Sequence, residues 1–211
     1  NASGSWSHPE GRMAAFLGDF IDPKKNHGYD VRAVLNLVKD LMDDGVAVAV
    51  MGNHEFNAVA YATESPDGGY LRPHETKNRE QGRKSYEQME GGHDGAEWQG
   101  WIEWFKKLPF FLELDGLRLA HAFWKPDSID ALRDASLQNG EFLLKANRKK
   151  AAEYEHVEAV LKGLEIDLPK GDSYFDKLGT KRYKFRARWF DNAPAGKGIA
   201  DLVFPFGSVK A

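Results

Sequence analysis

The sequence predicts a protein of the α/β class, and three consecutive segments carry that prediction. Residues 13–17 and 46–51 are short, continuous apolar runs, as in buried strands that are covered on both faces. Between them, apolar side chains recur over 31–42 at the spacing of an amphipathic helix. This order predicts a right-handed βαβ unit with parallel strands. We expect the unit to belong to a mixed sheet with helices on both faces.

The following segments predict further helices. A helix is expected over 56–63 and a loop over 64–72, and the polar stretch 74–90 fits either an exposed helix or a mobile lid. Residues 98–105 give a helix with an apolar face, and its tryptophans are expected in the core or at an interface. These tryptophans are Trp98, Trp101 and Trp104.

The second half of the sequence predicts one hairpin, more helices and a strand. Asp115-Gly116 separates two apolar runs, which is typical of a two-residue hairpin turn. Residues 129–161 are mostly helical and charged, and residues 183–190 alternate like a strand. We expect a single domain over 1–211, with a helical insertion or cap at 129–180.

The composition fits an ordinary globular domain and excludes several classes of protein. The 211 residues are 42% hydrophobic and 29% charged, with a formal net charge of -3. Such a balance gives no indication of a dedicated nucleic-acid-binding protein. The chain has no cysteine, so disulfides and thiolate metal sites are excluded. Its apolar runs are too short to span a bilayer, and no signal segment is recognisable, so we expect a cytoplasmic protein without a membrane partner.

Polar side chains follow the predicted strands where each strand ends. Gly18-Asp19-Phe20-Ile21-Asp22 follows the first strand, Gly52-Asn53-His54-Glu55 follows the second, and His121 ends the hairpin. Because parallel strands present their carboxyl ends at one edge of a sheet, we expect these side chains to meet. Taken singly, each has an ordinary structural explanation: a turn or cap for Asp19, a left-handed turn for Asn53, and a hydrogen-bonded core histidine for His121. Taken together, they indicate a site.

These blocks, in this order, resemble those of the calcineurin-like metallophosphoesterases, and most closely the bacterial relatives of the Ser/Thr protein phosphatases. The resemblance covers about Met13 to Phe123. It implies a β-sandwich with helices on both faces and a metal-dependent phosphoester hydrolase, that is, a phosphatase. It also implies the residue roles: Asp19, Asn53 and His121 as metal ligands, His54 as general acid, Asp22 as the group that holds and charges its ring, and Glu55 as a residue that steadies the loop.

The implied chemistry explains why these residue types are needed. In such hydrolases two divalent ions, about 3.5 to 4 Å apart, activate a water molecule and neutralise charge on the phosphoryl oxygens. A carboxylate, an amide oxygen and imidazoles suit manganese, and iron, zinc or nickel are alternatives. The substrate class stays open among phosphorylated small molecules, nucleotides and phosphoproteins, and the segments 64–95 and 129–161 are expected to select among them. The sequence does not indicate an oligomeric state.

The sequence departs from the family pattern at both ends. The family's Asp-x-His block before Asp19 and its terminal Gly-His block are not found. One explanation is that segments of the natural protein lie outside this chain. The other is a relative that has lost one metal site, which leads to an alternative function as a catalytically silent binding or regulatory domain. A third possibility is a mononuclear site that His27 completes.

A further departure concerns the phosphate ligand. The related phosphatases have an arginine directly after the second aspartate of the first block, where this chain has Pro23. Lys24 and Arg188 are therefore the candidate phosphate-binding residues. The remaining histidines have no matching spacing and are expected at the surface or in a lid: His8, His27, His74, His93 and His156.

Overall fold

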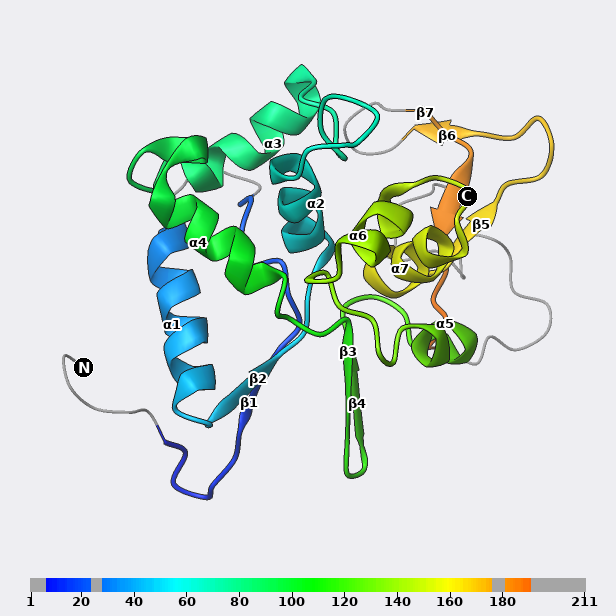
Figure 1. Ribbon diagram of the computed structural model, residues 1–211. Coiled ribbons are helices and arrows are strands. Elements are labelled where there is room, and N and C mark those ends of the chain that lie inside the picture. Colours follow the sequence, from blue (N-terminus) through cyan, green and yellow to red (C-terminus); the bar gives the residue numbers. More distant parts are fainter. Residues whose placement is uncertain (1–6, 24–27, 176–180, 191–211) are drawn as a thin grey trace.

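The computed structural model describes residues 7–23, 28–175 and 181–190. Over these ranges the protein contains 7 α-helices and several small sheets, which confirms the α/β class (Figure 1). In the described part of the chain, no helix is long and apolar enough to cross a membrane.

The predicted βαβ unit is present. Strand β1 (Ala14–Phe16) pairs in parallel with β2 (Ala47–Ala49), and α1 (Val31–Asp43) connects them. Helix α1 begins after Asp30, whose side chain accepts the backbone N–H of Ala33 at 2.9 Å, a typical N-cap. Its inner face packs into the core through Val31, Leu35, Val38 and Leu41.

Three more helices flank this unit: α2 (Asn53–Ala62), α3 (Thr76–Tyr86) and α4 (Ala96–Phe105), with the short 3-10 helix η1 (Gly92–Asp94) before α4. Helix α4 packs against α2 (Figure 1). Trp98 and Trp101 are buried and Trp104 packs against the same core, so the expected core placement of these tryptophans is confirmed. Within the stretch 74–90, Thr76–Tyr86 form a helix, but it is not fully exposed because Ser85 is buried.

The predicted hairpin is also present. Strands β3 (Phe111–Leu114) and β4 (Leu117–Ala120) pair around the turn Asp115-Gly116. Helices α5 (Pro126–Ala131), α6 (Gly140–Asn147) and α7 (Ala152–Lys162) follow, and α5 and α6 both pack on α7.

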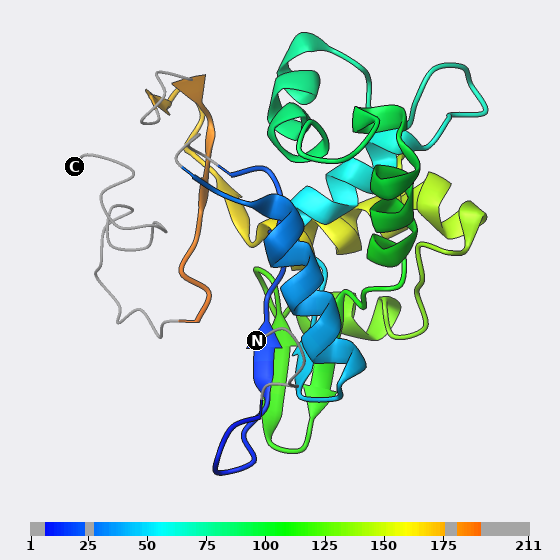
Figure 2. The same ribbon diagram turned by 90° about the vertical axis from the view of Figure 1, so that its left-hand side faces the viewer.

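Beyond α7 the chain forms short strands. β5 (Glu165–Asp167) pairs with β8 (Lys184–Arg186), and β6 (Tyr174–Phe175) pairs with β7 (Lys181–Arg182). Figure 2 shows them beside the helical body. The helices of the segment 129–180 thus end at Lys162, and the strand expected at 183–190 forms only over β8.

The described strands do not form one mixed sheet with helices on both faces. The strands form four separate two-stranded sheets. Strand β1 is also not the buried strand that its apolar run predicts, because Met13 and Leu17 at its ends are 56% and 45% exposed. An apolar run shows that side chains favour burial, but it does not show which element covers them.

Candidate active site

Two loops meet at the ends of β1 and β2, and their glycines permit the contact. A Cβ atom on Gly18, whose φ is +78°, would lie 2.2 Å from the backbone nitrogen of Gly52. A Cβ atom on Gly52 would lie 2.4 Å from the backbone nitrogen of Asp19. Asp19 and Asp22 both have positive φ angles, 58° and 57°, in a region that few residues other than glycine adopt. The first block is therefore a tightly turned loop that lies directly against the second.

Glu55 joins the two loops through hydrogen bonds to both. Its carboxylate is fully buried and accepts three backbone N–H groups, from Asp19 at 2.9 Å, Phe20 at 2.7 Å and Gly52 at 3.0 Å. Burial raises the pKa of Glu55, although the N–H groups of Asp19 and Phe20 oppose that rise by favouring the charged form. The bond to Gly52 caps α2, which for this reason begins at Asn53 and not at Phe56 as the sequence predicts.

His54 and Asp22 form a hydrogen-bonded pair beside this junction. The Nδ1 atom of His54 lies 2.9 Å from Oδ2 of Asp22, whose side chain is only 6% exposed. Ser85 holds the other carboxylate oxygen, because its hydroxyl donates to Oδ1 of Asp22 at 2.8 Å. Burial lowers the pKa of His54, but the bond to Asp22 and the negative charges of Asp19 and Asp22 outweigh burial and raise it. The site favours the imidazolium form.

Asp19 lies between two imidazoles. Its Oδ2 is 4.0 Å from Nε2 of His54, and its Oδ1 is 3.5 Å from Nε2 of His121. The backbone N–H of His54 donates to Oδ1 of Asp19 at 3.2 Å, which fixes that carboxylate. The structure thus brings together Asp19, Asp22, His54, Glu55 and His121, although His121 lies 102 residues after Asp19 in the sequence.

Asp19 and His121 are residue types that can bind a divalent metal. Nδ1 of His121 contacts the carbonyl oxygen of Leu17, and because a carbonyl only accepts, Nδ1 carries the proton. The lone pair of neutral His121 is then at Nε2, on the side of Asp19, as a metal ligand requires. Asn53, the first residue of α2, precedes His54. Within the described ranges, no group of three or more His, Cys, Asp or Glu could hold a metal ion, so Asn53 would be needed to complete a third protein ligand.

The front of the site opens on a cavity of 470 Å³. Asp19, Asp22 and His54 line it, together with Tyr29, which precedes α1, and Val34 of α1. A cavity of this size is in the range of small-molecule sites, which is about 300 to 1,000 Å³. The side chains of Asp19 and His54, which are 37% and 22% exposed, are therefore accessible to a ligand, whereas Asp22 is buried behind them.

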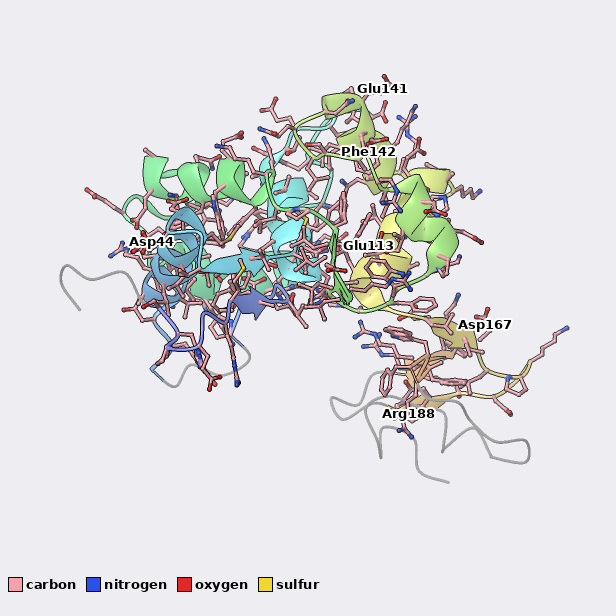
Figure 3. The ribbon with its side chains drawn as sticks, turned by 90° about the horizontal axis from the view of Figure 1, so that it is seen from below. Asp44, Glu113, Glu141, Phe142, Asp167 and Arg188 are labelled. Atoms are coloured by element: carbon pink, nitrogen blue, oxygen red, sulfur yellow. The ribbon has the colours of Figure 1, made fainter. Side chains whose placement is uncertain are left out.

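Of the two candidate phosphate ligands, only Arg188 lies within the described residues. Arg188 lies after β8 in the region of Asp167, on the opposite side of the molecule from Asp44, with its guanidinium 5.8 Å from the ring of Phe190 (Figure 3). The neighbouring Trp189 donates to the carbonyl of Ala122, the residue after His121, at 2.7 Å. Lys24 and His27 lie outside the described residues.

Sequence reasoning missed the residues that α3 brings to the site. Gln81 and Ser85 lie four positions apart in α3, and Gln88 lies two residues beyond its end. All three bond inward: Gln81 and Ser85 to Asp22, and Gln88 to the backbone N–H of Val31. Uncharged polar side chains at helical spacing, within an otherwise charged stretch, are the signal that could have identified them.

Three of the other histidines, which are expected at the surface or in a lid, are partly buried and packed against other residues. His74 is stacked between Tyr61 and Tyr70, with ring centroids 3.8 Å from each. His93 meets the ring of Tyr61 edge to face at 5.2 Å. His156 lies 3.1 Å from the hydroxyl of the buried Ser128. The spacing of histidines in a sequence does not reveal such packing.

Comparison of the chain with protein-family models, curated proteins and solved structures finds no match.

Proposed function

We propose that this protein is a metal-dependent phosphoester hydrolase, a phosphatase of the calcineurin-like type whose described strands are parts of that family's sandwich. One observation carries the proposal: His54 is bound at Nδ1 by the buried Asp22 and presents Nε2 towards Asp19, which His121 faces from the other side. The proposed general acid, His54, is thus adjacent to two proposed metal ligands, Asp19 and His121. Their residue types and order match the sequence blocks that resemble this family.

In this proposal His54 donates a proton from Nε2 to the leaving-group oxygen of a phosphoester. The imidazolium form is available for this role because Asp22 and Asp19 raise the pKa of His54. Asp22 holds the ring at Nδ1, so that Nε2 points towards the place of the reaction. The two nitrogens of the His54 ring therefore have different roles: Nδ1 binds Asp22, and Nε2 donates the proton.

Asp19, Asn53 and His121 would hold the divalent metal, with manganese expected and iron, zinc or nickel as alternatives. When bound, such an ion supplies a water of lowered pKa and neutralises phosphoryl charge. Glu55 keeps Asp19 in place by binding its backbone N–H. The phosphorylated group of a small molecule, nucleotide or protein would enter through the 470 Å³ cavity, where Lys24 or Arg188 would contact the phosphate.

The test is hydrolysis of p-nitrophenyl phosphate with manganese, with Mn²⁺ binding measured in parallel by calorimetry. We expect His54→Ala to lower kcat by roughly 10²- to 10⁴-fold while Mn²⁺ still binds, as for loss of a general acid. Asp19→Asn should lower both. His8→Ala and Asp44→Asn, at positions away from the site, are the matched controls and should leave both unchanged.

The alternative function is a catalytically silent binding or regulatory domain. One observation favours it: the bonds of Glu55 hold the two loops together whether or not the chain catalyses a reaction, so they give the motif a purely structural purpose. If the folded protein neither hydrolyses p-nitrophenyl phosphate nor binds Mn²⁺, this alternative replaces the enzyme.

A further inference from the structure

A chain of polar side chains leads from the interior to the pair formed by His54 and Asp22. It begins at Arg72, which is half-buried and whose pKa burial lowers. Its guanidinium donates from one nitrogen to Oδ1 of Asn57 at 2.6 Å and from another to Oε1 of Gln81 at 3.0 Å. Both bonds end on neutral amides. The guanidinium of Arg72 therefore orients the side-chain amides of Asn57 and Gln81.

The bond from Arg72 determines which way the Gln81 amide points. A guanidinium only donates, so the atom that it meets must be the amide oxygen. The NH₂ group consequently faces the other way, where its nitrogen lies 3.3 Å from Oδ2 of Asp22 and 3.1 Å from Nδ1 of His54. A reversed amide would place its oxygen against the Asp22 carboxylate, which repels it, and would offer the Nδ1 proton of His54 a competing acceptor.

We propose that Gln81, oriented by Arg72, is a positioning residue that fixes the Asp22 carboxylate and thereby the ring of His54. This inference rests on the proposed phosphatase function. Asp22 has a positive φ of 57°, and such a strained backbone conformation persists only where surrounding contacts hold the residue. Ser85 secures Oδ1, and Gln81 secures the oxygen that His54 also uses. Helix α3 is then the support of the acid and not a substrate lid.

A double-mutant cycle tests the proposed order of action. The variants are Arg72→Met, Gln81→Leu and the two combined, with Gln81→Glu added because it retains a partner for Arg72 but has no proton to donate to Asp22. Glu80→Leu is the matched control, since its carboxylate bonds only to Arg83 on the outer face of α3. Two quantities are measured: kcat and KM for p-nitrophenyl phosphate with manganese, and the ¹⁵N chemical shifts of the His54 ring at one fixed pH.

We expect Gln81→Leu and Gln81→Glu to lower kcat by about 10- to 100-fold with KM within about twofold, the range found for residues that orient ligands and acids. Arg72→Met should lower kcat similarly in the wild-type background and have almost no further effect in Gln81→Leu, because it acts through Gln81. The same variants should shift the ¹⁵N signals of His54, whereas Glu80→Leu should change neither quantity.

The proposal is overturned if Gln81→Glu retains wild-type kcat, if the effects of Arg72→Met and Gln81→Leu are independent, or if the ring signals stay unchanged. The spectra separate this inference from the proposed function. A wild-type protein without any hydrolysis refutes the phosphatase, and the response of the His54 signals then decides alone whether Gln81 and Arg72 position that ring.

Discussion

Replacing Glu55 by glutamine tests how the two loops are joined. The carboxylate accepts three N–H groups, two at Oε2 from Asp19 and Gly52 and one at Oε1 from Phe20. In its best orientation, glutamine keeps the two bonds at one oxygen and turns its NH₂ towards the N–H of Phe20. One buried bond is then lost and two buried donors face each other. At about 1 to 3 kcal/mol for each of these two unsatisfied groups, Glu55→Gln should lower the free energy of unfolding by about 2 to 6 kcal/mol.

Urea denaturation followed by tryptophan fluorescence measures this loss. The control is Glu80→Gln, which removes an exposed carboxylate that pairs only with Arg83 and should change the free energy by less than about 0.5 kcal/mol. If Glu55→Gln costs no more than this control, the carboxylate does not carry the junction and the reasoning is refuted.

Three further predictions concern other parts of the site. The pKa of His54 is raised above its unfolded value of about 6.5, so its contribution to stability is full below that value and is lost as the pH rises through the folded pKa. Asp22→Asn should make this loss smaller when the free energy of unfolding is measured at a series of pH values. Parallel curves for the wild type and the variant would contradict this prediction. Gly18→Ala should destabilise the fold by more than about 2 kcal/mol in urea denaturation. The control is Gly116→Ala, at a similar φ of +73° but in open space, which should cost only about 1 kcal/mol. Equal costs would show that the two loops are not in close contact. His121→Ala should weaken Mn²⁺ binding at least about tenfold in calorimetry, and an unchanged affinity would exclude this imidazole as a ligand.

The local elements of the fold could be predicted because their sequence signals are local. The helical spacing predicts α1, and the Asp115-Gly116 turn predicts the hairpin of β3 and β4. The two apolar runs predict the parallel pair of β1 and β2. The assembly could not be predicted in the same way. The strands stay in two-stranded sheets and Met13 and Leu17 are exposed, because an apolar run does not encode its partners.

The candidate site shows the same division. The two blocks predicted that Asp19, Asp22, His54 and Glu55 would meet, because parallel strands end at one edge. Gln81 could not be placed, since it reaches Asp22 from a helix 59 positions further along the chain and no motif surrounds it. A hydrogen bond between distant segments leaves no spacing rule in the sequence.

The most direct test of the account is the rate of p-nitrophenyl phosphate hydrolysis, with and without manganese, by the wild-type protein and by His54→Ala. The account predicts manganese-dependent hydrolysis that falls by roughly 10²-fold or more in the variant, with Mn²⁺ binding and folding intact. Hydrolysis that does not depend on manganese, or that persists at the wild-type rate in His54→Ala, would contradict it.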